Sequence, residues 1–149
     1  MKISECMCQD VCFVKPDCKT YDAARIMCEN HIGCIPVCDE QKKIVGIITD
    51  RDILLRTVAC NKDTKTTPVS EIMTTKVFTC QAEKDITEAQ NLMAQNQVRR
   101  IPVVDDTNKV VGMLTMGDLA QNDKKIGQQN VCTTIQNICN TQGSTKNNY

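Results

Sequence analysis

The chain has 149 residues, which is enough for one compact domain or for two small halves that share a core. Its 18 basic and 18 acidic side chains cancel, and no basic stripe is present, so binding to a nucleic-acid backbone is not expected. The amino terminus lacks the apolar stretch of a signal peptide, and no apolar run reaches the length of a membrane span. We therefore expect a soluble, cytoplasmic protein without a membrane partner.

Alternating apolar and polar stretches in the first part of the chain predict five elements. A short β-prone segment, Val11–Val14, is followed by a helical pattern over Tyr21–Asn30. Two apolar runs, Cys34–Cys38 and Ile44–Ile48, are joined by a short polar stretch and predict a hairpin. A closing helix is predicted after Thr49. The order is therefore strand, helix, strand, strand, helix.

The same order returns 66 residues later. Ser4–Ile53 aligns with Ser70–Leu119 without a gap, and 16 of these 50 positions are identical. Such similarity without a gap is not a chance event. The sequence predicts one supersecondary unit used twice around a pseudo-twofold axis rather than a solenoid.

The second copy carries clearer helix signals than the first. Its β-prone segment is Val77–Cys80 and its first helix is Thr87–Asn96. Asp85 and Glu88, three residues apart, have the spacing of a capping pair. The asparagine that ends this helix, like Asn30 in the first copy, suits a left-handed stop.

The repeat and its flanks divide the chain into four parts. We expect the first repeat at residues 1–60, a polar linker at 61–68, the second repeat at 69–122, and a carboxy-terminal part at 123–149. The last part contains a helical patch with Val131, Ile135 and Ile138, followed by the polar tail Asn140–Tyr149.

The motifs "IPV…VGIITDRDI" and "IPV…VGMLTMGDL", each preceded by a strand–helix unit and an "SE-x-M" opening, resemble a pair of cystathionine β-synthase (CBS) domains, or Bateman module. The resemblance covers about Ser4–Gln121. It implies an α/β fold of two pseudo-twofold-related β-α-β-β-α repeats, packed sheet against sheet with two clefts between them. In this family the clefts bind adenosine-containing ligands such as AMP, ADP, ATP or S-adenosylmethionine. The modules usually regulate another protein and are not enzymes.

The repeated motif Thr49-x-x-Asp52 and Thr115-x-x-Asp118 allows two interpretations. The residues alone predict a capping box at the start of a helix. The resemblance implies that each aspartate also binds ribose hydroxyls and that each threonine lies near phosphate. The interpretations are compatible, because a helix amino terminus favours anions. A catalytic pair of Asp50 and Asp52 is disfavoured, since the second copy has no acid at the first of these positions.

The resemblance also implies two unequal clefts. Cleft A would combine Thr49 and Asp52 with Val77–Thr79 and Val98–Arg100 of the second repeat. Arginine suits phosphate there, because its planar guanidinium can bind two oxygens at once. Arg51, which has a glycine partner in the second copy, could contact phosphate on this side only.

Cleft B would combine Thr115 and Asp118 with the first repeat, where Phe13 replaces a threonine, and Gly33 and Cys34 replace the two arginines. We therefore expect cleft A to bind a phosphorylated adenosine compound better than cleft B. The complete set of expected ligand-binding residues is Ile32, Gly33, Thr49, Arg51, Asp52, Thr79, Val98, Arg99, Arg100, Thr115 and Asp118.

Eleven cysteines, an odd number without an export signal, favour reduced thiols over a disulfide framework. Some cysteines align with apolar residues of the second copy and should fill the core as small hydrophobes: Cys6, Cys12, Cys28 and Cys38. Others align with polar residues and should be more exposed: Cys8, Cys18 and Cys34. The spacings within Cys6–Cys12 and Cys34–Cys38 leave open a metal site, although a structural site wants four ligands in two close pairs. A redox-reactive thiol is a further alternative.

We expect a regulatory module that binds an adenosine nucleotide or S-adenosylmethionine, requires no cofactor or metal and forms a homodimer. Its output would act in trans on an effector protein, which requires that ligand and partner bias the same two-state element. The alternatives are a ligand-free dimerisation or interaction module and a cysteine-based metal or redox sensor.

Overall fold

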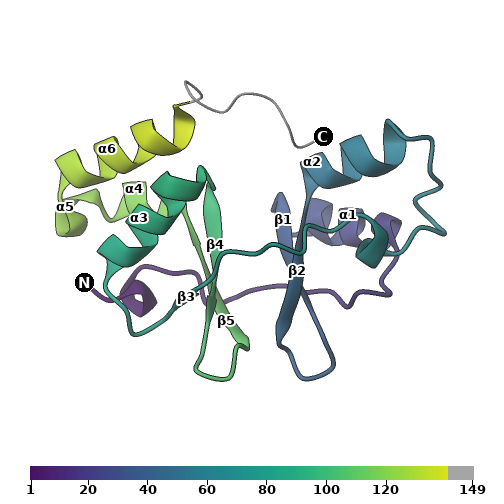
Figure 1. Cartoon of the computed structure of the whole chain (residues 1–149), viewed down its shortest axis with the longest axis horizontal. Helices are drawn as coiled ribbons and strands as arrows, with labels where there is room; N and C mark the ends of the chain where they lie inside the picture. Colours follow the sequence, from purple (N-terminus) through teal and green to yellow (C-terminus); the bar gives the residue numbers. More distant parts are fainter. Residues whose placement is uncertain (141–149) are drawn as a thin grey trace.

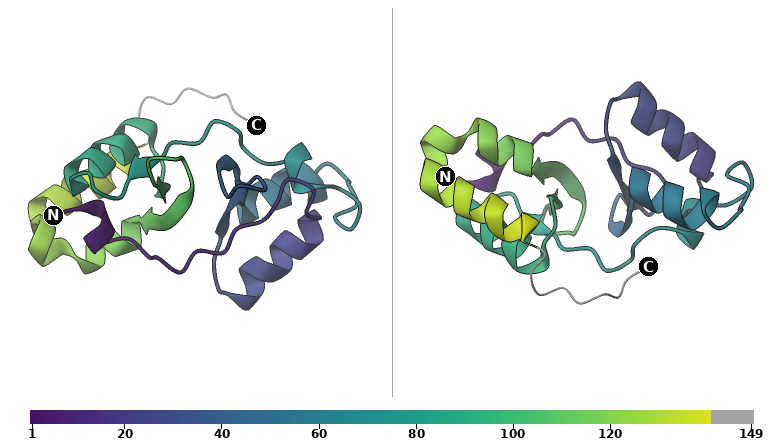
Figure 2. Two further views of the ribbon diagram at one scale, coloured as in Figure 1. Left: turned by 90° about the horizontal axis from the view of Figure 1, so that it is seen from below. Right: turned by 90° about the horizontal axis from the view of Figure 1, so that it is seen from above.

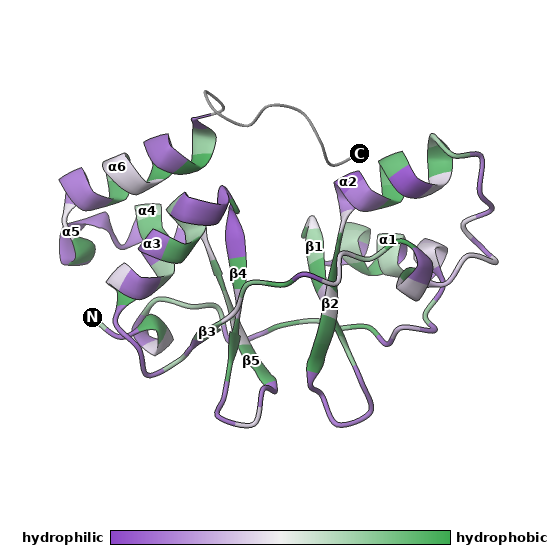
Figure 3. Ribbon diagram, viewed as in Figure 1, coloured by the Kyte–Doolittle hydropathy of each residue, from purple (hydrophilic) through white to green (hydrophobic). Residues whose placement is uncertain are grey.

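Two antiparallel hairpins organise the computed structural model, which describes residues 1–140 (Figure 1). In the first half, β1 (Cys34–Cys38) pairs with β2 (Ile44–Thr49). In the second half, β4 (Arg100–Val104) pairs with β5 (Val110–Thr115) in the same register 66 residues later. Both predicted hairpins are confirmed. Figure 3 shows how strongly apolar residues are concentrated along them.

Helices cover the outer side of each hairpin and leave the inner sides facing one another (Figure 1). The helices of the first half are α1 (Thr20–Glu29) and α2 (Asp50–Ile53), and α2 continues as a π-helical segment over Leu54–Val58. The helices of the second half are α3 (Ile86–Asn96) and α4 (Met116–Gln121), followed by α5 (Asp123–Ile126) and α6 (Gln128–Cys139). This is the α/β arrangement that the sequence predicts. No helix within residues 1–140 is long and apolar enough to cross a membrane.

The first strand of each repeat is much shorter than predicted. Val14 makes a single parallel bridge with Val37, so a strand over Val11–Val14 is wrong. In the second repeat β3 is only Cys80–Gln81, parallel to β4, and overlaps the predicted Val77–Cys80 at one residue. In both repeats the residues before this short strand or bridge leave the sheet, because the chain crosses there from one half to the other. The two crossing segments run on opposite sides of the molecule (Figure 2).

Each repeat lends its opening segment to the core of the other half. Ile3 and Cys6 are buried in the core of the second half, beside Ile101 and Leu114. The matching residues, Val69 and Ile72, are buried in the core of the first half. These residues are apolar and occupy matching positions in the two repeats, but the sequence does not indicate in which half they pack.

Paired backbone hydrogen bonds hold the two crossing segments. Cys8 and Met113 exchange two bonds of 2.9 Å, and Thr74 and Ile47 exchange two bonds of the same length. A Cβ atom on Gly46 would lie 3.2 Å from the Thr74 carbonyl oxygen, and the matching glycine of the second repeat is equally close to its crossing segment. The repeated glycine therefore allows the crossing chain to lie directly on the hairpin.

The helix ends are partly as predicted. Asp85 is the N-cap of α3, and its carboxylate accepts a hydrogen bond of 3.0 Å from the Thr87 amide. Glu88 pairs instead with Lys84, at 3.9 Å. The left-handed residue lies one position after each predicted asparagine, at His31 (φ 53°) and at Gln97 (φ 52°). The side-chain amides of Asn30 and Asn96 instead donate hydrogen bonds to helix carbonyls four residues earlier.

The helical patch predicted near the carboxyl end is α6. Val131 and Ile138 are buried, Ile135 is half-buried, and α6 packs on α3, where the Gln90 amide donates a 3.2 Å hydrogen bond to the Thr134 hydroxyl. The predicted polar tail lies, from residue 141 onward, outside the described residues.

Candidate functional site: two clefts between the halves

Cleft A is a cavity of about 500 Å³ between the end of β2 and the crossing segment of the second repeat. The first half contributes the carboxyl end of β2 and the first turn of α2, and the second half contributes the crossing segment, the end of α3 and the start of β4. Its lining residues include four that the sequence predicts to bind ligand: Thr49, Asp52, Val98 and Arg100.

Thr49 and Asp52 form the predicted capping box. The Thr49 hydroxyl accepts a 3.0 Å hydrogen bond from the Asp52 amide, and the Asp52 carboxylate accepts one of 3.0 Å from the Thr49 amide. The other Asp52 oxygen lies 3.5 Å from the Arg56 guanidinium. A carboxylate oxygen can accept more than one hydrogen bond, so Asp52 retains acceptor capacity toward the cleft.

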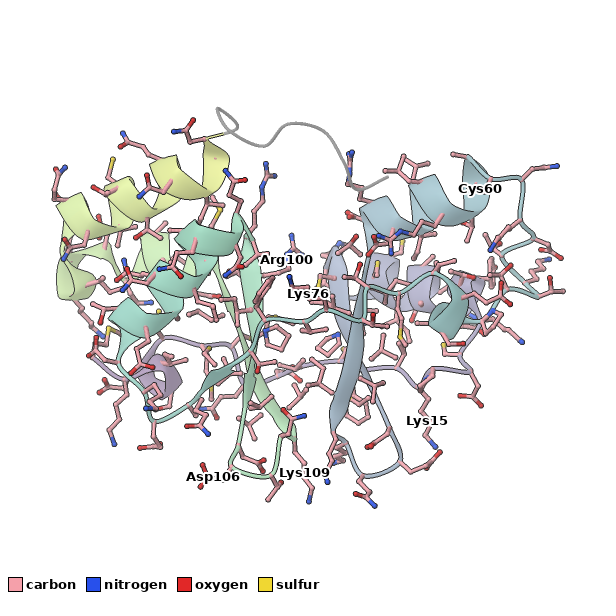
Figure 4. The ribbon with its side chains drawn as sticks, viewed as in Figure 1. Lys15, Cys60, Lys76, Arg100, Asp106 and Lys109 are labelled. Atoms are coloured by element: carbon pink, nitrogen blue, oxygen red, sulfur yellow. The ribbon has the colours of Figure 1, made fainter. Side chains whose placement is uncertain are left out.

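Two cations lie in cleft A opposite this carboxylate. Arg100, at the start of β4, is half-buried, and Lys76, on the crossing segment, is exposed. Figure 4 shows both of them in the space between the two halves. The Lys76 ammonium also lies 5.5 Å from the centre of the Phe78 ring. Sequence reasoning missed Lys76, and its only signal was the alignment with the acid Asp10.

Cleft B is a cavity of about 340 Å³ at the matching place on the other side. Thr115 and Asp118 form the same capping box, and the Asp118 carboxylate accepts from the Thr115 amide at 2.7 Å and from its hydroxyl at 2.6 Å. Ile32 also lines the cavity, as expected. Asp10 stands where cleft A has Lys76, and Cys34 stands where it has an arginine. Among the described residues that line cleft B, two are carboxylates and none is a cation.

The remaining predicted residues lie outside both clefts. Arg99 and Gly33 line a third cavity of about 440 Å³, which lies between clefts A and B. Thr79 lines a separate groove beside β3 and α3, whereas the preceding Val77 and Phe78 line cleft A. Thr79 and Arg99 are not among the lining residues of cleft A, and that they bind ligand stays a prediction. Arg51 is exposed on the first turn of α2.

The two clefts meet where Arg100 faces Cys34 across the interface between the halves. Arg100 lines cleft A, Cys34 lines cleft B, and both line the third cavity. Burial raises the pKa of the Cys34 thiol to about 11, and the neighbouring Arg100 guanidinium opposes that rise. A ligand that engages Arg100 in cleft A therefore acts on a side chain that also contacts Cys34, a residue of the cleft B lining.

The cysteines only partly follow the alignment. Cys6 and Cys38 are buried and Cys8 is exposed, as predicted. Cys28 is exposed, because it lies on the outer side of α1, where a small apolar residue is tolerated. Cys34 is buried rather than exposed, because Arg100 of the other half covers it. Within residues 1–140, no three His, Cys, Asp or Glu side chains are arranged to hold a metal ion.

Comparison with known proteins identifies both repeats. A family model for the CBS domain matches residues 3–58 and 69–125. The CBS domain-containing protein YhcV of Bacillus subtilis is 42% identical over 120 residues, which span 80% of this chain and 84% of YhcV.

Three solved structures share the fold. The CBS domain pair of protein MJ0100, in complex with 5′-methylthioadenosine and S-adenosyl-L-methionine, has a TM-score of 0.75, 28% identity, and coverage of 85% of this chain and 98% of that one. CBSX2 in complex with AMP has a TM-score of 0.72 and 26% identity, and the match covers 84% of this chain and 97% of CBSX2. Hypoxic Response Protein I, with two coordinated zinc ions, has a TM-score of 0.74 and 30% identity, and the match covers 81% of this chain and 98% of that protein.

Proposed function

Because the chain belongs to the CBS domain family and carries two such domains, we propose that it is a regulatory module that binds a phosphorylated adenosine compound in cleft A. The observation that carries the proposal is the placement of Asp52 from one half and Arg100 from the other on the same cavity. A carboxylate suits ribose hydroxyls, as in dinucleotide-binding folds, and an arginine suits phosphate.

The rest of cleft A matches the other parts of such a ligand. Val77, Phe78 and Val98 provide apolar surface for the flat adenine ring. Lys76 adds a second positive charge near the expected phosphate. AMP, ADP and ATP all carry the required groups, and CBSX2, which shares the fold, binds AMP.

Cleft B suits an adenosine compound without phosphate. Its two carboxylates, Asp10 and Asp118, would repel a phosphate, and neither cation of cleft A has a counterpart there. The two ligands bound by MJ0100, 5′-methylthioadenosine and S-adenosylmethionine, contain adenosine but no phosphate. We therefore propose that cleft B accepts compounds of that class.

The module binds rather than catalyses, because Asp52 and Asp118 act as helix caps and acceptors, roles that require no proton transfer. Each cleft takes one wall from each half, so a bound ligand changes how the halves contact one another. By linkage, a cytoplasmic effector protein that prefers one arrangement of the halves would respond to the ligand in trans. No cofactor is needed for this role.

Thermal unfolding in the presence of a nucleotide panel tests the proposed function. At a hundredfold excess over Kd, a ligand stabilises the folded state by about 2.7 kcal/mol. AMP, ADP or ATP should raise the Tm through cleft A, and 5′-methylthioadenosine or S-adenosylmethionine through cleft B, while GMP serves as the base-specificity control. If no adenosine compound raises the Tm, the ligand-free interaction module is the better account.

We also propose a homodimer that forms through the helices of the first half. Leu54 and Val58, four residues apart after α2, are 57% and 61% exposed. In the second half, the matching side is partly covered by α6, which packs on α3 and α4 (Figure 1). A second copy of the same surface would bury both apolar side chains around a twofold axis.

Leu54→Glu is expected to weaken the dimer by roughly 30-fold, because losing an apolar anchor and burying a charge in its place together cost about 2 kcal/mol or more. Sedimentation velocity over a range of concentrations measures this change. Ala120→Glu is the matched control, since Ala120 aligns with Leu54 and is exposed in the second half. A monomeric wild-type protein, or an unchanged dimer in Leu54→Glu, would contradict the proposed surface.

A further inference from the structure

Three of the cysteines converge on cleft B. Cys8, Cys12 and Cys34 all line this cavity of about 340 Å³. The repeat shows that these thiols are not required by the fold, because the aligned residues that line cleft A are, in the same order, Thr74, Phe78 and Arg100. The concentration of thiols is therefore a property of one cleft only.

The three thiols differ in access. Cys8 is exposed at the edge of the cavity, Cys12 is half-buried, and Cys34 is buried. The Cys8 thiol donates a hydrogen bond of 3.6 Å to the main-chain oxygen of Asp10, so it is held beside that residue. Burial raises the pKa of the Cys34 thiol to about 11, which makes it a poor nucleophile at neutral pH. Cys8 is consequently the thiol that a molecule entering cleft B meets first.

The charge of the cavity selects which molecules enter. Asp10 and Asp118 both line cleft B, and the described residues of its lining include no Lys or Arg. Arg100 contacts Cys34 from the neighbouring third cavity, whereas Cys8 at the exposed edge has Asp10 beside it. An acidic cavity concentrates cations and repels anions. A small reagent with a positive charge should therefore reach Cys8 more often than a negatively charged reagent of the same kind.

We propose that Cys8 in cleft B is a modification site for small, positively charged disulfides, and that the mixed disulfide excludes an adenosine ligand from this cleft. The Cys8 thiolate attacks one sulfur of the reagent, and a new S–S bond forms as the reagent's S–S bond breaks. The other half leaves as a thiolate and takes up the proton that Cys8 released, so no further oxidant is needed. Exclusion of the ligand rests on the proposed function, whereas the modification itself does not.

The adduct would interfere directly with ligand binding because of where Cys8 is fixed. Its backbone exchanges two hydrogen bonds of 2.9 Å with Met113, which also lines cleft B. The attached group therefore stays within the cavity that contains Asp118, the residue expected to bind ribose. Cleft A has a threonine at the matching position and would remain open.

The first experiment treats the reduced full chain with cystamine, which is cationic, or with dithiobis(nitrobenzoate), which is anionic, and measures the modification rate of each cysteine by peptide mass spectrometry. The exposed Cys132 on α6 serves as the internal reference. The ratio of the modification rate with cystamine to the rate with dithiobis(nitrobenzoate) should be about fivefold higher at Cys8 than at Cys132. This factor corresponds to the interaction energy of one charge pair a few ångströms apart in water. Asp10→Lys places at this position the residue type that cleft A has at Lys76, and it should reverse this preference.

Thr74→Cys is the matched control, because it places a thiol at the corresponding position of cleft A, beside Lys76. That thiol should prefer the anionic reagent. Equal preferences at Cys8 and Cys132, or no modification at Cys8 while Cys132 reacts, would overturn the proposal.

The second experiment tests exclusion of the ligand. Saturating 5′-methylthioadenosine should slow modification of Cys8 at least tenfold, leave Cys132 unchanged, and lose its effect in Asp118→Ala. Selective modification of Cys8 without protection by 5′-methylthioadenosine would overturn the exclusion and contradict the ligand proposed for cleft B. The modification site would still be supported by the first experiment, so the two failures are distinguishable.

Discussion

Replacing Asp52 by alanine is expected to weaken binding of AMP by roughly 10- to 150-fold. The carboxylate lies on cleft A with acceptor capacity to spare, and hydrogen bonds to a charged group contribute about 1.5–3 kcal/mol. Losing the ribose contacts removes most of that contribution, and the adenine and phosphate contacts that remain cannot replace it. Isothermal titration calorimetry with AMP measures the change in Kd.

Asp118→Ala is the matched control for this result. Both variants lose the reciprocal hydrogen bond of a capping box, which costs about 1 kcal/mol of stability in each half. Their Tm values should therefore fall by similar amounts, while only Asp52→Ala loses affinity for AMP. Equal losses of affinity in the two variants would contradict the asymmetry of the clefts, and an unchanged Kd in Asp52→Ala would exclude cleft A as the site.

Arg100→Gln is expected to weaken binding of AMP by roughly 10- to 100-fold and to leave binding of adenosine within twofold of the wild type. The guanidinium lines cleft A and carries the charge that complements phosphate, whereas adenosine has no phosphate to lose. Comparing the two ligands by calorimetry separates a phosphate contact from a general effect on the cavity. The affinity of the wild type for AMP should also fall with added salt, since ions screen the contact.

Arg25→Gln controls for the loss of a positive charge elsewhere. Arg25 is exposed on α1 and forms a 3.0 Å ion pair with Glu29, far along the chain from the residues of cleft A. This variant should bind AMP like the wild type. A parallel loss of adenosine affinity in Arg100→Gln would show that Arg100 supports the shape of the cleft rather than binding phosphate.

Much of the fold could be predicted because it is local and occurs twice. The apolar runs of the two hairpins, the helical patterns of α1 and α3, and the capping boxes at Thr49 and Thr115 all follow from residue spacing within about ten positions. The repeat without gaps supports these predictions, because the hairpin and capping-box patterns occur in both copies. The same patterns carried the resemblance to CBS domains.

The exchange of opening segments could not be predicted in the same way. Ile3 and Val69 are apolar and occur in matching positions, but either half could bury them as far as the sequence shows. The orientation of the crossing segments depends on that exchange. Phe78 lines cleft A and Thr79 lines a separate groove, so the expectation that Thr79 binds ligand stays a prediction.

One part of the charge difference between the clefts, at Lys76 and Asp10, was missed for the same reason. Lys76 and Asp10 are aligned charges of opposite sign, which the sequence displays plainly. Nothing within a few residues of either indicates that it lies beside a cavity formed with the other half. Only the fold shows that this reversal of charge distinguishes cleft A from cleft B.

We propose that a phosphorylated adenosine compound binds between Asp52 of one half and Arg100 of the other. A crystal structure of the protein grown with AMP tests it most directly. We predict AMP in cleft A, with the ribose hydroxyls at the Asp52 carboxylate and the phosphate within hydrogen-bonding distance of Arg100, and no AMP in cleft B. AMP bound in cleft B while cleft A stays empty, or a phosphate directed away from Arg100, would contradict the account.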